Sequence, residues 1–229
     1  AYTDYRGLMD FSAELLRATA IEATGAAVVE YQGAQLDFGN VRRFTMREAI
    51  VEFWRGGDRP SMEQLKDTEW LKRHSSQSSA GYALMELFER IVEEQLMQPT
   101  MIYDYPVEVS PLSKNKPDEP EMVERFEIYA GGMEIGNAYT ELNDPREQRR
   151  RFESQTALRE AGDQEAHQMD QDYLRAMCYG MPPTGGEGIG IDRLAMLLTN
   201  SKSIRDVILF PLLRPEGEIG LARQLKELE

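Results

Sequence analysis

Two segments in the second half of the chain combine residue types that could bind a nucleotide and a metal ion. The first, residues 186–193, has the sequence Gly-Glu-Gly-Ile-Gly-Ile-Asp-Arg. Alternating glycines remove side chains from one face of a strand, so a flat ligand can lie against the backbone. Arg193 follows at the start of a predicted helix, where a fixed guanidinium can meet phosphate oxygens. A glycine-rich turn without a ligand stays open for this segment alone, whereas its spacing does not match a dinucleotide-binding loop.

The second segment, residues 125–144, predicts a β-hairpin with two consecutive glycines at its turn. In a regular hairpin of this length Glu127 lies opposite Gly136, and Glu127 and Glu134 point to the same face. Two such carboxylates repel each other unless a cation lies between them. Mg²⁺ suits this arrangement because it typically joins one or two carboxylates to substrate phosphates. For this segment alone, exposed strand glutamates without a metal remain the alternative.

The elements that must position these residues alternate between helices and strands, and we expect one domain with a mixed α and β composition. Capping residues, turn residues and hydrophobic periodicity mark their ends. The predicted helices cover residues 4–25, 45–54, 81–97 and 192–198, with one further helix that starts at Pro145 and another that ends at Gly180. The predicted strands cover 28–38 (a hairpin), 100–105, 121–142 and 185–191. The helix that starts near Pro145 carries three consecutive arginines, Arg149 to Arg151. We interpret them as a solvated face, with RNA binding as the weaker alternative.

Charge balance and cysteine count limit the classes of function. The chain has 229 residues, 40 acidic and 26 basic, with a formal net charge of −14. Nucleic-acid binding through phosphate contacts normally needs a basic face. The composition therefore favours a small ligand, or a nucleic-acid contact that is local or lies elsewhere. Cys178 is the single cysteine, which fits a reducing compartment, so we expect a cytoplasmic protein. No apolar run approaches the roughly 20 residues that cross a bilayer, so we expect no membrane partner.

Together the two segments resemble class II aminoacyl-tRNA synthetases, and specifically the lysyl enzymes. Residues 186–193 resemble the third motif that defines this class. Residues 133–144, with the sequence MEIGNAYTELND, resemble the signature strand of the lysyl enzymes. The resemblance spans essentially the whole chain and includes residues 5–25, 98–100, 105–112, 179–184 and 204–211. It implies an α+β fold in which helices flank an antiparallel β-sheet, and it implies that this sheet belongs to a partial catalytic domain.

The resemblance also implies the substrates and the reaction. In a lysine-tRNA ligase, the lysine carboxylate attacks the α-phosphate of ATP to form lysyl-adenylate, and the lysyl group is then transferred to tRNA(Lys). It implies that Glu127 and Glu134 hold Mg²⁺ on ATP and that Arg193, the implied catalytic residue, meets the γ-phosphate. Gly188 and Gly190 would lie along the nucleotide.

Three residues of the signature strand would contact the amino acid. Asn137 would touch lysine or ATP, and Tyr139 would flank the aliphatic stem of lysine. Glu141 distinguishes the amino acid, because the acid-binding relatives carry an arginine in the corresponding strand. A carboxylate there suits an ammonium group.

The resemblance also indicates what residues 1–229 do not contain. Family members carry an N-terminal anticodon-binding domain, a first motif that builds a homodimer, and a second motif with a catalytic arginine. The sequence begins Ala1-Tyr2, which resembles only the end of that second motif. We therefore expect the C-terminal portion of a catalytic domain, inactive alone. Two alternatives stay open: a non-catalytic synthetase-like binding or regulatory module, and a paralogue that attaches a lysine-like group to a protein.

One conflict in the signature strand gives a geometric prediction. Side chains alternate faces along a strand, so Glu134 and the three amino-acid-binding residues would lie on opposite faces of a regular strand. The implied function needs all four on one face. We therefore predict a bulge or kink at Gly136-Asn137, which would bring them onto the face that Gly188 and Gly190 line.

Overall fold

A computed structural model describes residues 1–160, 162 and 168–211. Helices and strands are mixed along the chain, as the sequence predicts. The helices are α1 (Tyr5–Thr24), α2 (Met46–Phe53), α3 (Thr68–His74), α4 (Ala80–Ile91), α5 (Pro145–Glu160), α6 (Gln171–Met177) and α7 (Ile191–Leu198). The strands are β1 (Val28–Tyr31), β2 (Ala34–Asp37), β3 (Arg42–Thr45), β4 (Thr100–Pro106), β5 (Met122–Ala130), β6 (Met133–Thr140) and β7 (Gly185–Ile189). Short 3-10 turns are η1 (Gln64–Lys66), η2 (Glu93–Gln95), η3 (Val107–Val109) and η4 (Ile204–Asp206).

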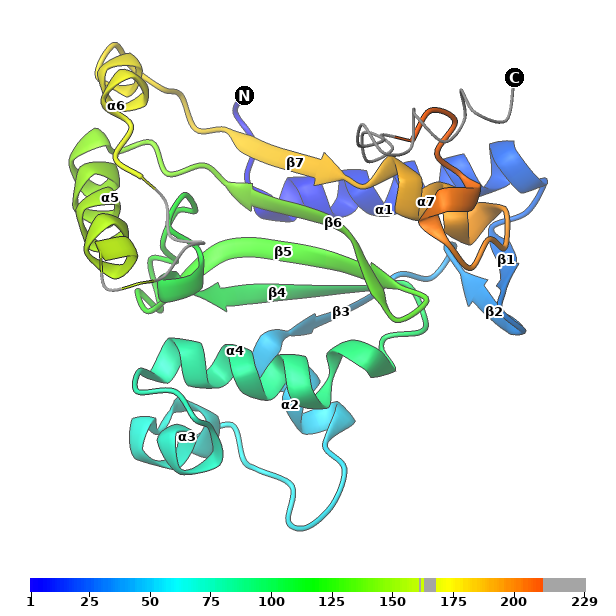
Figure 1. Ribbon diagram of the computed structural model, residues 1–229, viewed down its shortest axis with the longest axis horizontal. Helices are drawn as coiled ribbons and strands as arrows, with labels where there is room; N and C mark the ends of the chain where they lie inside the picture. The colour runs from blue at the N-terminus through cyan, green and yellow to red at the C-terminus, as the bar shows by residue number, and fades with distance from the viewer. Residues whose placement is uncertain (161, 163–167, 212–229) are drawn as a thin grey trace, which may run out of the picture.

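A five-stranded sheet with the order β3-β4-β5-β6-β7 forms the centre of the described residues (Figure 1). Neighbouring strands from β4 to β7 pair antiparallel, as the resemblance implies. β3 pairs with β4 in parallel, so the sheet is mixed rather than wholly antiparallel. The parallel pair arises because α2, α3 and α4 lie between β3 and β4 in the chain and return it to the same end of the sheet.

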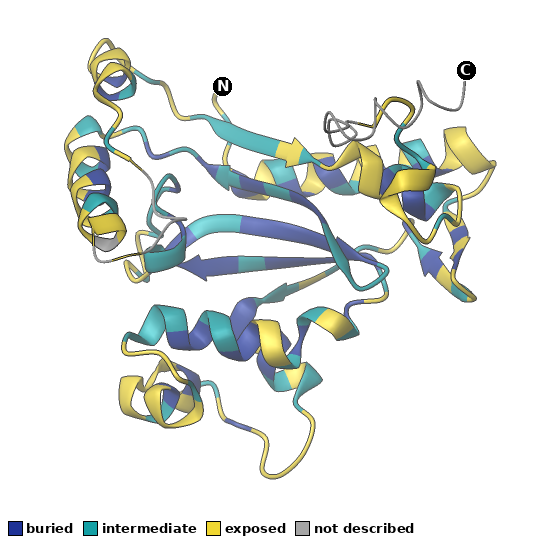
Figure 2. Ribbon diagram, in the orientation of Figure 1, coloured by how far each residue is buried: buried dark blue, intermediate teal, exposed yellow. Residues whose placement is uncertain are grey.

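Helices cover the sheet on both faces (Figure 1). α1 and α7 pack against β6, and α1 also contacts β5 and β7. α2 and α4 pack on the opposite face, against β4. Figure 2 shows that β4 and β5 are almost wholly buried between these layers. Among the described residues, α2, α3 and α4 do not pack in this way against β6 and β7, so the face of these two strands opposite α1 is less covered.

Local sequence signals fix the ends of several helices. The Asp4 carboxylate accepts hydrogen bonds from the first backbone N–H groups of α1, and Gly25 ends it with a left-handed φ of 85°. Thr45 and Glu48 form a capping box at the start of α2. The predicted helix over residues 81–97 is too long, since α4 ends at Ile91 and η2 follows. Beyond η2, the carbonyls of Leu96 and Met97 accept hydrogen bonds from the N–H groups of the β5–β6 turn.

The interpretation of the arginine triplet as a solvated face is wrong for one of its members. Arg149 and Arg150 are exposed, whereas Arg151 is buried at 7% exposure. The Arg151 guanidinium donates to the carbonyls of Ser110 and Ser113, at 3.2 Å and 2.6 Å. Arg151 therefore ties α5 to the loop before β5. Its guanidinium is already bound within the protein, so it does not form an RNA-binding face.

Within the described part of the chain, no helix is long and apolar enough to span a membrane.

Candidate active site

The bulge predicted in the signature strand is present, one residue earlier than expected. Tyr129 pairs with Glu134, but its neighbour Ile128 pairs with Gly136, so Ile135 is the extra residue of β6. Glu127 consequently lies opposite Asn137 and not opposite Gly136 as a regular hairpin predicts. The bulge falls at Ile135 because this side chain is buried at 1% exposure in the core under α1. The alternation of side chains between the two faces of β6 therefore shifts by one residue at Ile135, and the Ile135 side chain stays in the core.

This bulge brings the predicted residues to one face. Directly paired residues on neighbouring strands point to the same side of a sheet. Glu134 therefore shares a face with Tyr129 and Glu127, and Asn137 shares it with Glu127. Tyr139 and Glu141 follow at alternate positions along the chain, so they keep that face.

β7 forms the glycine-lined side of this face. Asn137 pairs with Gly188, and Tyr139 pairs with Gly186. Among the described residues, a Cβ at Gly188 would have a single atom within 4 Å, the Asn137 carbonyl oxygen at 4.0 Å, so these residues leave the space above it open. A Cβ at Gly186 would lie 2.1 Å from the Glu141 Oε1 atom. The glycines thus leave room for a ligand at one position and for the Glu141 side chain at the other.

Arg193 and Glu134 meet at the far end of this face. Gly190 precedes α7 and its N–H donates to the carbonyl of Ile135 over 2.9 Å, which joins the helix start to the bulge. The Arg193 guanidinium lies 2.6 Å from the Glu134 carbonyl oxygen and 3.5 Å from its carboxylate. Burial, and then the charge of Glu127, raise the pKa of Glu134 above its ordinary value despite Arg193. A second cation beside Glu134 would relieve this unfavourable charge.

Glu127 is buried and lies within a set of donors. Its Oε2 accepts from the hydroxyls of Tyr105 at 2.9 Å and Tyr129 at 2.5 Å. Its Oε1 accepts from the Arg125 guanidinium at 2.5 Å. Burial, and then the Glu127 charge, raise the pKa of both tyrosines, so both hydroxyls remain donors. A carboxylate has about four acceptor positions, so these three bonds leave Glu127 about one for a metal ion.

The Glu127 and Glu134 carboxylates fit one Mg²⁺ ion that is bound mainly through Glu134. In the described part of the chain, the Glu134 carboxylate has only the 3.5 Å contact with Arg193, so its oxygens are more available than those of Glu127. Mg²⁺ commonly binds one or two protein carboxylates and takes its other ligands from phosphates and water. Among the described residues, no cluster of three or more acidic, histidine or cysteine side chains could hold a metal without such extra ligands.

Two charged residues near this face, Arg125 and Glu93, were not identified from the sequence as part of the site. Arg125 lies between Glu127 and Asn137, and its Nε donates to the Asn137 Oδ1 at 2.9 Å. Glu93 of η2 faces the same region: burial, followed by the charges of Glu89, Glu127 and Glu134, raises its pKa. Arg125 could have been found from its position, two residues before Glu127 on the same strand face. Glu93 gives no such signal, since it comes from a different segment.

Glu141 lies in a cavity of about 410 Å³ near the end of β6. The cavity is lined by Leu112, Tyr139, Glu141, Phe152, Gln168, Asp170 and Tyr173. In the described part of the chain, no side chain or backbone group hydrogen-bonds to or ion-pairs with the Glu141 carboxylate. Burial alone raises the pKa of Glu141. An unpaired, half-buried carboxylate beside an aromatic wall suits a ligand with a cationic end and an apolar stem.

Helices α5 and α6 supply the outer wall of this cavity, which the sequence did not reveal. The rings of Phe152 and Tyr173 lie edge to face with centroids 6.1 Å apart. Burial raises the pKa of Tyr173 first, followed by the charge of Glu141. These residues come from separate segments and carry no motif, so only the fold brings them together.

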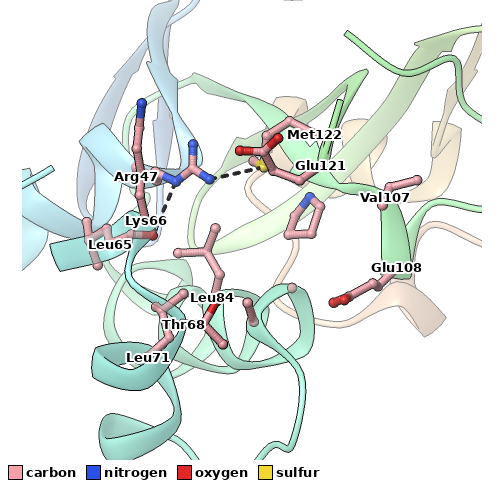
Figure 3. A pocket seen from close by; sticks show the side chains of 13 residues that line it. Arg47, Leu65, Lys66, Thr68, Leu71, Leu84, Val107, Glu108, Glu121 and Met122 are labelled. Atoms are coloured by element: carbon pink, nitrogen blue, oxygen red, sulfur yellow. Dashed lines mark hydrogen bonds between the residues drawn. The ribbon is translucent and has the colours of Figure 1, made fainter. Parts of the chain in front are cut away.

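A second cavity, of about 300 Å³, lies between α2, α3 and α4 (Figure 3). Three of its four charged side chains, those of Arg47, Lys66 and Glu108, already have partners. The Arg47 guanidinium pairs with Glu119 and donates to the Leu65 carbonyl and the Met122 sulfur. The Glu108 carboxylate accepts from the hydroxyl of Ser79. This cavity therefore offers a ligand fewer free polar groups than the sheet face does.

The fold and the carboxylate–arginine–glycine face define a class II tRNA synthetase domain. Residues 1–214 match the family of class II tRNA synthetases (D, K and N), and the chain belongs to this family. Relatives with similar sequences are named lysine–tRNA ligases. One, from Methylobacillus flagellatus, is 50% identical over 225 residues, which are 94% of this chain and 44% of the relative. Another, from Moorella thermoacetica, is 50% identical over 227 residues, which are 95% of this chain and 46% of the relative. The chain thus spans less than half the length of these relatives.

Proposed function

We propose that this chain provides the ATP- and lysine-binding part of a lysine-tRNA ligase. Such an enzyme activates lysine with ATP to lysyl-adenylate and transfers the lysyl group to tRNA(Lys). Family membership and the relatives named lysine–tRNA ligase support this proposal. Because the chain spans 44% of the first relative, activity of the whole enzyme needs further parts.

One observation carries the choice of lysine. The Glu141 carboxylate lies in a cavity with two tyrosines, without a partner among the described residues. A lysine side chain would place its ε-ammonium at Glu141 and its methylene stem against Tyr139. A bound aspartate or asparagine would leave Glu141 unpaired or facing a like charge, which costs binding energy.

The ATP-binding roles follow from the rest of the face. We propose that Arg193 binds a phosphate of ATP, releasing its contact with the Glu134 backbone, and that Glu134 with Glu127 holds the Mg²⁺ that ATP brings. The ion would neutralise phosphate charge. Gly188 and Gly190 give the nucleotide a side-chain-free surface on which to lie. Asn137 lies between the two ligands and would touch either lysine or ATP. The protein's contribution is then positioning and charge stabilisation, without a protein nucleophile.

Partners beyond the small substrates are also proposals. We propose tRNA(Lys) as the acceptor and a homodimer as the working form, on the strength of the family alone. We propose a cytoplasmic location on the same ground, since protein synthesis takes place there.

The two alternatives differ from this proposal in a measurable way. A non-catalytic binding module would bind lysine and ATP without turnover. A paralogue that modifies a protein would form lysyl-adenylate without charging tRNA.

The experiment is lysine-dependent ATP–pyrophosphate exchange, followed by charging of tRNA(Lys), with the full-length protein that carries this sequence. We expect exchange with lysine and none with aspartate or asparagine. Exchange without tRNA charging would favour the paralogue. Binding of both ligands without exchange would favour the non-catalytic module, and exchange with aspartate or asparagine instead would refute the lysine assignment.

A further inference from the structure

All three nitrogens of the Arg125 guanidinium donate hydrogen bonds to other groups of the protein. Its side chain is 18% exposed and its guanidinium carbon lies 4.7 Å from the centroid of the Tyr105 ring. Nη1 donates to the Ser110 Oγ at 2.8 Å and to the Val109 carbonyl at 3.0 Å. Nη2 donates to Glu127 at 2.5 Å. The guanidinium plane is therefore held by stacking and by bonds on both sides, and it cannot rotate without breaking several of them.

The remaining bond, from Arg125 Nε to Asn137 at 2.9 Å, sets the orientation of the Asn137 amide. A guanidinium has only donors, so the amide atom that faces it must be the oxygen. The Nδ2 group must then point away from Arg125. Among the described residues, none accepts a hydrogen bond from Nδ2. Asn137 thus offers two N–H donors to the open face above Gly188, with which it pairs.

We propose that Arg125 is a positioning residue that makes Asn137 a fixed donor to the anionic group of the substrate. This inference rests on the proposed function, because it assigns the orientation of one of its binding residues. The substrate group is a carboxylate or a phosphate oxygen, since only an acceptor matches two N–H donors. The amide is oriented before the ligand arrives, so binding does not have to pay for ordering it.

The position of Arg125 also couples two parts of the face. The same guanidinium holds Asn137 through Nε and Glu127 through Nη2. Asn137 and Glu127 are paired residues on β6 and β5. Arg125 therefore fixes the Asn137 amide relative to the Glu127 carboxylate on the ligand side of the sheet.

A double-mutant cycle in the full-length protein tests this role. Arg125→Lys keeps a cation for Glu127 but cannot form the planar set of bonds that reaches Asn137. We expect Arg125→Lys and Asn137→Ala each to lower kcat/KM for lysine in pyrophosphate exchange by about 10- to 100-fold. In the Asn137→Ala background, the added loss from Arg125→Lys should shrink to less than about 3-fold. An equal loss in both backgrounds would overturn the proposal.

Asn137→Asp provides a readout that a merely structural role would not move. An aspartate at 137 still accepts from Arg125, so the melting temperature should be kept or raised, while its second oxygen faces the substrate anion. We expect lysine or ATP affinity, measured by calorimetry, to fall by at least about 10-fold with the fold intact. Unchanged affinity for both ligands would refute the donor role of Asn137.

Two controls keep the outcome interpretable. If Arg125→Lys does not fold, Ser110→Ala removes a single anchor of Nη1 and should give a smaller loss with the same dependence on Asn137. An equal loss with and without Asn137 would again overturn the proposal. If the unmodified full-length protein shows no lysine-dependent exchange, the proposed function itself fails. If it is active and the cycle is simply multiplicative, only the role of Arg125 fails.

Discussion

Glu134 and Asn137 point to the same face of β6 although three positions separate them along the strand. Ile135 is the extra residue that makes this possible, since Tyr129 pairs with Glu134 while Ile128 pairs with Gly136. The bulge keeps Ile135 in the core and brings a proposed metal ligand and a proposed amino-acid ligand to one side. Bulges recur beside active sites because they redirect side chains in this way.

Arg193→Ala should abolish lysine-dependent pyrophosphate exchange in the full-length protein, with a loss of at least about 100-fold. Arg193 is exposed and its protein contacts are with Glu134, so its removal should leave the melting temperature nearly unchanged. Arg90→Ala is the matched control, because Arg90 is an exposed arginine on α4. Undiminished exchange in the Arg193 variant would remove the phosphate role from this residue.

Glu141→Gln should weaken lysine binding by about 10- to 150-fold, which corresponds to about 1.5–3 kcal/mol for a hydrogen bond to a charged group. ATP affinity should change by less than about 2-fold. Glu153→Gln, at an exposed position of α5, is the control for loss of one negative charge. Calorimetric titration of each ligand measures both constants. Equal weakening of lysine and ATP would mean that Glu141 supports the fold rather than the ammonium group.

The pH dependence of Glu141→Gln provides a separate test. Burial raises the pKa of Glu141, so the folded state keeps this proton at a pH where the unfolded chain has lost it. A carboxyl group with a raised folded pKa favours folding below its unfolded pKa, and this contribution is lost as pH rises through the folded pKa. We therefore expect Glu141→Gln to raise the melting temperature at pH 7.5, by about 1–2 °C, and to leave it unchanged at pH 4.

Lysine binding should show the opposite trend with pH. The ammonium group binds the ionised carboxylate, so affinity in the unmodified protein should fall on acidification, starting above the pH range of an ordinary glutamate. The glutamine variant should lack this part of the pH dependence. In the melting experiment, an equal effect of Glu141→Gln on the melting temperature at pH 4 and at pH 7.5 would show that Glu141 is not the titrating group.

The sequence predicted those parts of the fold and site that depend on local order. The cap of the first helix and the turn at Gly131-Gly132 involve neighbouring residues, and both are present; of Thr3 and Asp4, which the sequence offers as caps, the structure uses Asp4. The need for a bulge followed from strand parity, but its position at Ile135 depended on which residue the core under α1 buries. Phe152 and Tyr173 could not be predicted as cavity walls, because the packing of α5 against α6 brings them there.

The burial of Arg151 also depends on tertiary packing that the sequence of the charged helix α5 does not show. Its composition predicts solvent exposure for all three members, yet Arg151 is buried with four hydrogen-bond partners. The acceptors belong to Glu147 and to residues 110, 113 and 115 of a loop. A helical periodicity cannot reveal that a loop will cover one arginine and not its neighbours.

Arg151→Met should therefore destabilise the protein by about 2–3 kcal/mol, since it leaves two buried carbonyls with one donor fewer each. Arg149→Ala, at an exposed position of the same helix, should change the free energy of unfolding by less than about 0.5 kcal/mol. Urea unfolding of both variants measures the difference. Similar stabilities for the two variants, with a shared loss of tRNA affinity, would support the RNA-binding interpretation instead.

Gly186 and Gly188 lie two residues apart on one face of β7, and the same substitution should affect different ligands at the two positions. A Cβ at Gly186 would lie 2.1 Å from the Glu141 Oε1 atom, so Gly186→Ala must displace the Glu141 side chain. We expect lysine affinity to fall by about 10-fold or more, because the charge-assisted bond depends on carboxylate position, while ATP affinity is largely kept.

At Gly188 an added Cβ would meet no atom of the described residues closer than 4.0 Å, so Gly188→Ala should fold normally. The methyl group would instead occupy the open surface on which the nucleotide is proposed to lie. ATP affinity should therefore fall by about 10-fold, with a smaller change for lysine. Calorimetric titration of both ligands into both variants gives four constants. A crossed pattern supports separate lysine and nucleotide positions along β7, whereas equal losses of both ligands in both variants would show that the strand does not divide the site in this way.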